Sequence, residues 1–344
     1  MILGIETSCD DTSAALVDND GHVKALVSAN QDSAHRPFGG VVPEVASRQH
    51  TENILPLIDR ALQESGVGWD KLRGIAVTNR PGLIGSLLVG VVTAKTLSLV
   101  RGLPIIGINH IEGHLLAPLL KDTSYTPPRD FGFPYLGLAV SGGHTHLFAV
   151  EGPGKYKLLG QTLDDAAGEA FDKFAKMMKL GFPGGVRVDQ LAKDGDVAAF
   201  RFPRGLIHED NLDFSFSGLK TAAMREIEAL PEPERELRKA DLCASYQEAI
   251  VEVLIHKLEK AARKTGLKNW TITGGVSANS RLRAKAAESA IRKKAVLALP
   301  PLKYCTDNAA MIALAGLYKL KVGQSSGQEL SPSAASLPDD WLPA

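Results

Sequence analysis

Short apolar runs recur along the chain, and two stretches share one arrangement of apolar and small polar positions. Residues 4–18 align without a gap with residues 137–151, and each stretch predicts a strand, a tight turn of small polar residues and a second strand. Each is followed, much later, by a strand that breaks at glycines before a helix, at residues 74–78 and 270–273. Two similar halves predict an α/β protein of two lobes with a cleft between them.

The division between the halves falls at residues 122–134, which are rich in proline and other breakers of regular structure. Residues 309–314 predict an apolar helix, which we expect to pack back on the first lobe. From Ser333 onward the chain has no periodicity, which is typical of a loose tail. The expected lobes are residues 1–121 with 308–344, and residues 134–307 with an insertion at about 180–240.

Composition narrows the class of protein. The 344 residues are 44% apolar and carry 39 basic and 39 acidic side chains, so the chain can form two cores but has no net charge to attract nucleic acid from a distance. It has no leader-like N-terminus and no continuous apolar run of about eighteen residues or more, which predicts a cytoplasmic protein without membrane contact. Cys9, Cys243 and Cys305 are too scattered for a disulfide framework or a C-x-x-C metal site.

A histidine pair stands between a predicted strand, residues 104–109, and an apolar helix. If the helix begins at an Asn109 cap, His110 and His114 lie on one face of its first turns, where two neutral imidazoles can chelate one divalent ion. A pair of ordinary polar helix residues is the alternative. Asp307, just before the helix at 309–314, is a candidate third ligand, and an N-cap is its alternative role.

The spacing of the pair argues against a zinc peptidase. Such enzymes carry H-E-x-x-H, with the general base directly after the first histidine. Here Glu112 stands two positions after His110, so at about 100° per residue it points elsewhere.

Two glycine-rich turns are candidates for anion binding. Residues 141–145 join two strands, and their glycines let backbone N–H groups come close to a phosphate. Residues 274–279 lead into a helix, whose N-terminal N–H groups and dipole favour an anion. Ordinary tight turns are the alternative. In the first half, Asp10 and Asp11 fill the matching turn, either as base or positioning carboxylates or as turn formers.

The densest basic run lies on the predicted helix after residue 279. This run is the best candidate for contact with a phosphate backbone, and a solvated helix face is its alternative. Its members are Arg281, Arg283, Lys285, Arg292, Lys293 and Lys294.

Eight motifs, in one order over residues 1 to about 320, resemble the bacterial TsaD family, formerly described as O-sialoglycoprotein endopeptidases. They are GIETSCD at 4–10, GGVVPE at 39–44, NHIEGH at 109–114, VSGGHT at 140–145, DDAAGEAFDK at 164–173, DFSFSGLK at 213–220, GGVSAN at 274–279 and CTDN at 305–308.

The resemblance implies a two-lobed fold of the actin, hexokinase and heat-shock-protein-70 type. It also implies transfer of a threonylcarbamoyl group from threonylcarbamoyl-AMP to the exocyclic amine of the adenosine just 3′ of the anticodon, in tRNAs reading codons that begin with A. By the family's motifs, one divalent metal, iron or otherwise zinc, is held by His110, His114 and Asp307. The adenylate, whose site ATP or AMP also fits, is held by Ala139, Val140, Ser141, Gly142, Gly143, Asp172, Gly185, Asp189 and Asn279.

Three protein partners follow from the same resemblance: a TsaB-like paralogous scaffold, a TsaE-like P-loop ATPase and an upstream threonylcarbamoyl-AMP synthase. Two positions depart from the family pattern. Arg80 replaces a usual glycine, and Asp11 replaces a usual Glu, whose carboxylate reaches about one methylene further. The rival functions are a metallopeptidase, a sugar or acetate kinase of the same fold, and a non-catalytic scaffold.

Overall fold

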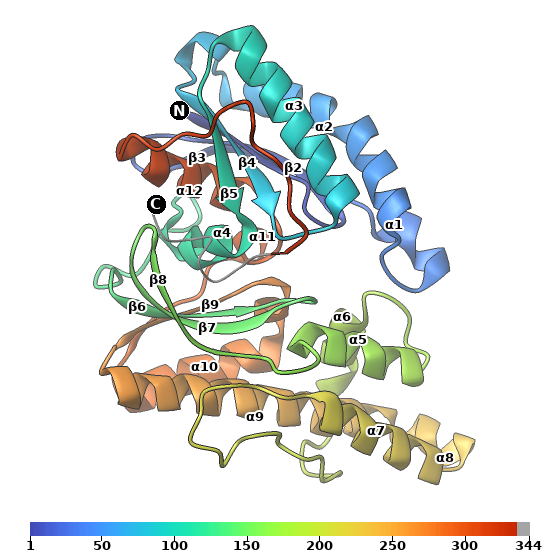
Figure 1. The fold of residues 1–344 in the computed structure, drawn as a ribbon. Helices are drawn as coiled ribbons and strands as arrows, with labels where there is room; N and C mark the ends of the chain where they lie inside the picture. The colour runs from blue at the N-terminus through green and yellow to red at the C-terminus, as the bar shows by residue number, and fades with distance from the viewer. Residues whose placement is uncertain (336–344) are drawn as a thin grey trace. The chain divides into compact units, whose positions relative to one another are not determined.

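The computed structural model describes residues 1–335, which form two compact α/β units (Figure 1). The first unit comprises Met1–Arg129, Glu151–Tyr156 and the chain from Pro300, and the second comprises Asp130–Val150 and Lys157–Leu299. Residues 300–307 belong to the first unit, whereas the sequence analysis assigned them to the second lobe. They join the first unit because Lys303 and Tyr304 both bind the carboxylate of Asp122.

The first unit contains one sheet with the strand order β3-β2-β1-β4-β5. The first three strands along the chain form an antiparallel meander, and β1, β4 and β5 run parallel. The strands are β1 (Ile2–Glu6), β2 (Asp11–Val17), β3 (Val23–Asn30), β4 (Gly74–Arg80) and β5 (Ile105–Asn109).

Helices cover both faces of this sheet (Figure 1). Leu3 and Ile5 of β1 face a core built with α2 and α3, whereas Gly4 between them faces α12. A Cβ atom on Gly4 would overlap the carbonyl oxygen of Ala309, so only glycine lets α12 lie this close to β1. The helices are α1 (Asp32–His35), α2 (Pro43–Ser65), α3 (Ile84–Arg101), α4 (His110–Leu116), α11 (Leu302–Cys305) and α12 (Ala309–Lys321).

The second unit contains a sheet with the order β10-β9-β6-β7-β8. Its apolar core includes Phe174 and Tyr246, whose rings stack with centroids 4.0 Å apart. The strands are β6 (Tyr135–Val140), β7 (Thr145–Gly152), β8 (Lys155–Gln161), β9 (Asn269–Thr273) and β10 (Val296–Ala298); the helices are α5 (Ala167–Met177), α6 (Gly184–Ala192), α7 (Ser217–Ala229), α8 (Glu232–Leu237), α9 (Lys239–Thr265) and α10 (Ser280–Lys293).

The two sheets have the same topology. Each starts with an antiparallel strand pair, β1 with β2 and β6 with β7, and then adds a parallel strand from much later in the chain, β4 beside β1 and β9 beside β6. This confirms the internal duplication and the α/β fold class predicted from the sequence. The expected insertion at about 180–240 contains α6, α7 and α8.

Arg80 fits its position without a glycine. It ends β4, aligns with Asn109 of β5, and its backbone lies outside the left-handed region. The glycine that this turn requires is Gly82, where a Cβ atom would collide with Ser8. The departure from the family pattern therefore leaves the turn intact.

Within residues 1–335, α3 is the one helix whose length and apolar composition would let it cross a membrane. Leu87, Val91 and Ala94 are buried, and α3 packs on β4 and α2. The apolar composition of α3 is therefore explained by its packing against the sheet. Further apolar side chains of this helix lie on its exposed face.

We predict that Gly4→Ala lowers the free energy of unfolding by about 1–3 kcal/mol, because the new methyl group must push α12 away from β1. Gly218→Ala on α7 is the matched control, since no other atom lies within 4 Å of its added Cβ. Denaturant unfolding of both variants measures the difference. Equal stability of the two variants would contradict the close packing of α12.

Candidate metal centre and adenylate site

The histidine pair lies where the sequence predicts it. β5 ends at Asn109, whose side chain accepts a hydrogen bond of 2.9 Å from the backbone N–H of Ile111 and so caps α4. His110 and His114 are both buried on one side of this helix, and their Nε2 atoms lie 3.1 Å apart. The alternative reading of two ordinary polar helix residues does not fit this burial.

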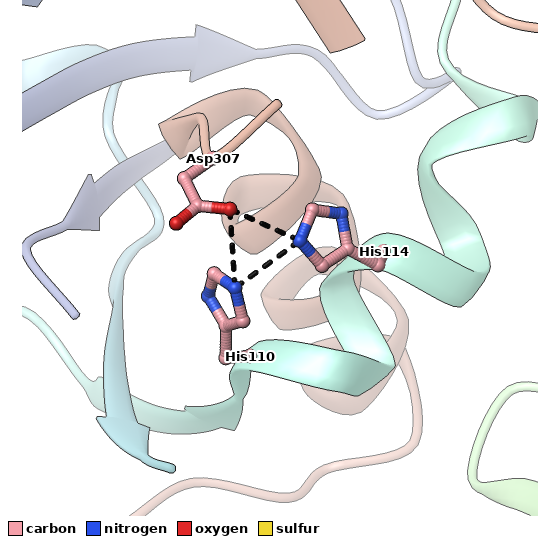
Figure 2. Close-up of side chains that lie close together, drawn as sticks. All are labelled: His110, His114 and Asp307. Atoms are coloured by element: carbon pink, nitrogen blue, oxygen red, sulfur yellow. Dashed lines mark hydrogen bonds and ion pairs between the residues drawn. The ribbon is translucent and has the colours of Figure 1, made fainter. Parts of the chain in front are cut away.

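Asp307 completes the cluster (Figure 2). Its Oδ1 lies 3.1 Å from Nε2 of His114 and 3.3 Å from Nε2 of His110. The cap of α12 is instead Asn308, whose side chain accepts from the N–H of Met311. The capping role considered for Asp307 is therefore wrong, and its carboxylate faces the two imidazoles.

These three atoms have the separations of ligands on one metal ion. At bond lengths of about 2.0–2.2 Å, ligand atoms at angles of roughly 90–110° are about 2.8–3.6 Å apart. The observed distances of 3.1, 3.1 and 3.3 Å fall within that range. Two imidazole nitrogens and a carboxylate oxygen this close together require at least one proton or a cation between them.

The electrostatics of the cluster agree with this requirement. Burial opposes charge on the His110 ring, yet the carboxylates of Asp307 and Glu6 raise the pKa of His110 well above its ordinary value. Burial likewise opposes charge on Asp307, but His110 and His114 hold the pKa of Asp307 well below its ordinary value. The cluster therefore attracts a positive charge, whether a proton or a metal ion.

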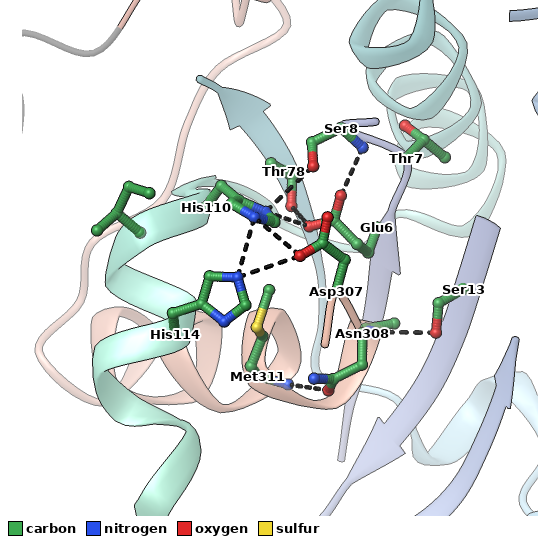
Figure 3. Close-up of polar contacts among 12 residues, drawn as sticks. Glu6, Thr7, Ser8, Ser13, Thr78, His110, His114, Asp307, Asn308 and Met311 are labelled. Atoms are coloured by element: carbon green, nitrogen blue, oxygen red, sulfur yellow. Dashed lines mark hydrogen bonds and ion pairs between the residues drawn. The ribbon is translucent and has the colours of Figure 1, made fainter. Parts of the chain in front are cut away.

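The carboxylate of Glu6, which the sequence analysis did not select, contacts His110 from the sheet side (Figure 3). Its Oε2 lies 3.0 Å from Nδ1 of His110 and accepts from the hydroxyl of Thr78 at 2.6 Å. Its Oε1 accepts from the N–H of Ser8 at 2.5 Å. The available signal was a charged residue inside the apolar strand β1, which requires a buried partner.

Glu112 points away from the cluster, as its spacing predicts. Its two oxygens bind the hydroxyl of Tyr156 at 3.0 Å and the ammonium of Lys319 at 3.1 Å. It therefore cannot serve as the base of a metallopeptidase acting at His110 and His114.

Asp10 and Asp11 lie at the turn from β1 to β2. Asp11 and Asp307 line the same cavity, of about 670 Å³. Burial, together with the negative charges of Asp307 and Asp10, raises the pKa of Asp11 to about 7, and burial also raises the pKa of Asp10. A carboxyl group with such a pKa can take up or release a proton near neutral pH.

A buried histidine that the sequence analysis missed holds this turn. Nε2 of His50 donates to the carbonyl of Cys9 at 3.0 Å, and its Nδ1 is 2.7 Å from the hydroxyl of Thr12. Because Cys9 and Thr12 flank the two aspartates, these contacts with His50 of α2 hold the turn in place.

The second unit brings the predicted adenylate residues to one region. Residues 139–143 comprise the end of β6 and the glycine turn after it, and Gly274 packs so closely on Val140 that a Cβ atom on Gly274 would overlap the Val140 carbonyl. Ser141 also accepts from the N–H of Gly168 on α5 at 3.2 Å. Gly142 and Gly143 have no other atom within 4 Å of an added Cβ, so their turn is open to a ligand.

The remaining predicted side chains cap helices around this turn. Asp172 accepts from the N–H of Gly184, next to Gly185 at the start of α6. Asp189 accepts from the N–H and hydroxyl of Ser280 at the start of α10. Asn279 accepts from the N–H of Leu282 and donates to Gln247 at 2.6 Å. These residues therefore fix two helix N-termini, the ends that favour phosphate.

The basic run on α10 is paired with acidic residues of α9. Arg281 and Lys285 bind Glu248, and Arg292 binds Glu259 at 2.5 Å. Because these cations are already paired, the run packs two helices together and offers less free charge to RNA than the sequence suggested.

Solved structures with the same architecture belong to the actin and hexokinase type of fold. Component A of (R)-2-hydroxyglutaryl-CoA dehydratase from Acidaminococcus fermentans has a TM-score of 0.55 at 14% identity, with 94% of this chain and 99% of that chain covered. Full-length HypF in its phosphate- and nucleotide-bound form has a TM-score of 0.62 at 12% identity, over 93% of this chain and 55% of that chain. At these identities the likeness establishes the fold alone.

Curated relatives are much more similar in sequence. A protein of Bdellovibrio bacteriovorus is 57% identical over 341 residues, with 99% of both chains covered, and one of Anaeromyxobacter dehalogenans is 52% identical, with 97% of this chain and 98% of that one covered. Both are named tRNA N6-adenosine threonylcarbamoyltransferase. The profile of the TsaD family, described by the same name, matches residues 22–314. The chain belongs to the TsaD family of tRNA N6-adenosine threonylcarbamoyltransferases.

Proposed function

We propose that this tRNA N6-adenosine threonylcarbamoyltransferase works with one divalent metal ion held by His110, His114 and Asp307. The observation that carries the proposal is the convergence of two buried imidazole nitrogens and one carboxylate oxygen, 3.1 to 3.3 Å apart. Two histidines and one carboxylate are the donor set typical of non-haem iron(II) sites with open positions, and zinc also accepts these donors. When bound, such an ion supplies Lewis acidity to a carbamoyl carbonyl.

The transfer joins the exocyclic nitrogen of adenosine to the carbamoyl carbon of threonylcarbamoyl-AMP. The bond from that carbon to the phosphate oxygen breaks, and AMP leaves. The nitrogen must lose one proton, and Asp11 is the candidate acceptor because burial, together with the charge of Asp307, raises its pKa to about 7. Asp10 is assigned a positioning role at the same turn.

The adenylate is assigned to the second unit. The open turn at Gly142 and Gly143 offers backbone N–H groups for its phosphate, and the positive ends of the α6 and α10 dipoles lie in the same unit. We assign Asp172, Asp189 and Asn279 to this site, where their capping bonds hold the helix ends in position.

The protein partners are those that membership of the family implies, a TsaB-like scaffold and a TsaE-like ATPase in a cytoplasmic assembly. Charge supports their role: with no net charge and a paired basic run, the chain has little attraction of its own for tRNA, so partner surfaces supply further contacts. The exposed apolar residues Leu88, Val92 and Leu99 of α3 form the surface assigned to the scaffold. A separate synthase supplies the adenylate.

We predict that His110→Ala, His114→Ala or Asp307→Ala abolishes metal binding and most threonylcarbamoylation of tRNA. Metal analysis of purified protein and nucleoside analysis of tRNA from a reconstituted reaction measure the two losses. Asn308→Ala is the matched control. It should keep the metal while losing about 1 kcal/mol of stability, because Asn308 caps α12.

Wild-type metal content in His110→Ala would contradict the metal assignment. The same experiment separates the rival functions. Unimpaired modification by the variant would indicate a non-catalytic scaffold, whereas phosphoryl transfer to a small molecule would indicate a kinase. Metal-dependent cleavage of a glycoprotein would indicate a peptidase.

We predict that the rate of transfer rises with pH to a plateau, with a midpoint at or below about pH 7. The reason is that Asp11 accepts a proton only when ionised, and its pKa is raised to about 7. A bound cation would offset the charge of Asp307 and lower this midpoint. Asp11→Asn should remove the acidic limb and lower the plateau by about 10²-fold or more. An unchanged profile would exclude Asp11 as the base.

We predict that Gly142→Val weakens AMP binding at least tenfold with the fold unchanged. The added side chain meets no other residue within 4 Å of its Cβ but stands where the phosphate must approach. Gly132→Val, at another open glycine outside the turn, is the control. Calorimetric titration with AMP compares the two, and equal affinity would show that residues 139–143 are only a turn.

A further inference from the structure

Glu6 is a charged residue at the end of a strand in which every residue is buried. Its side chain is fully buried. Both carboxylate oxygens are occupied: Oε1 by the N–H of Ser8 at 2.5 Å, and Oε2 by the hydroxyl of Thr78 at 2.6 Å. These donors come from the turn after β1 and from the neighbouring strand β4, so the carboxylate is held rigidly.

The third contact of this carboxylate is with His110. Oε2 of Glu6 lies 3.0 Å from Nδ1 of His110, and the hydroxyl of Ser8 lies 3.1 Å from the same nitrogen (Figure 3). An ionised carboxylate can only accept hydrogen bonds, so the proton between Glu6 and His110 belongs to Nδ1. The lone pair of a neutral ring then lies on Nε2, the atom that faces His114 and Asp307.

We propose that Glu6 is a positioning residue that keeps the proton of His110 on Nδ1 and thereby presents Nε2 to the metal ion. This inference rests on the proposed metal site. Without Glu6, the neutral ring is free to carry its proton on Nε2 and to donate to Oδ1 of Asp307, 3.3 Å away. In that arrangement Nε2 of His110 has no lone pair for a metal ion, and the hydrogen bond to Asp307 must break before an ion can bind.

The two histidines differ in this respect. Among the described residues, Nδ1 of His114 is buried and has no hydrogen-bond partner. Of the two histidines, His110 is therefore the one whose ring is oriented by a hydrogen bond at Nδ1, and Glu6 accepts that hydrogen bond. Removing an outer carboxylate of this kind typically weakens metal binding by about 10–100-fold.

The test compares two isosteric substitutions of buried carboxylates. Glu6→Gln removes the charge behind His110. Glu112→Gln removes one at the first turn of α4, where the carboxylate binds Tyr156 and Lys319 and faces away from the cluster. Zn²⁺ dissociation constants are measured by competition with a chelator, and circular dichroism checks the fold. We expect affinity about 10–100-fold weaker for Glu6→Gln and within about twofold of wild type for Glu112→Gln.

A second measurement needs no variant at position 6. In Zn²⁺-loaded wild-type protein, ¹⁵N NMR of the imidazoles should show His110 protonated at Nδ1, with the signal assigned by its absence from His110→Ala. Metal-bound Nδ1, or wild-type affinity in Glu6→Gln, would overturn the role of Glu6 alone. A wild-type protein that binds no Zn²⁺, Co²⁺ or Fe²⁺ would overturn the metal site and this inference together.

Discussion

The confinement of two buried imidazole nitrogens and a carboxylate oxygen within 3.3 Å of one another is the constraint that organises the first unit. Such a cluster repels itself unless a cation or a proton lies between its members. Every element that contributes to it must therefore be held by packing elsewhere. β5 and α4 are held by the Asn109 cap, and Asp307 is held by the joint between α11 and α12.

The position of Asp307 depends on how closely α12 approaches the sheet. Gly4 allows the first turn of α12 to lie against β1, and Gly113 leaves room for Met311 and Ile312 against α4. Gly316 packs on Ala76 of β4 in the same way. These close contacts fix the helix, and the helix fixes the carboxylate just before it. Packing in the apolar core therefore also sets the position of the Asp307 carboxylate beside the two histidines.

The second unit uses polar side chains for two purposes. Asp172, Asp189 and Asn279 satisfy backbone N–H groups at the starts of α6 and α10, so that these helix ends are held around the glycine turn after β6. A ligand at that turn would meet an arrangement that is already rigid, which lowers the entropic cost of binding. Ion pairs between α9 and α10 join these two helices and neutralise Arg281 and Arg292, two of the cations that the sequence offered to RNA.

Local pattern determined the strands of both halves, their duplication, the start of α4 at Asn109 and the direction of Glu112, because each depends on residues near one another in the chain. For Asp307 the residues alone left two roles open, and the resemblance favoured the role of metal ligand. Only the tertiary structure showed that Asn308 caps α12 and that residues 300–307 belong to the first unit. It also showed that cations of α10 form ion pairs with acidic residues of α9. It alone brought Glu6 to His110, a contact between residues 104 positions apart. Such contacts arise from strand order and helix packing, which no local periodicity encodes.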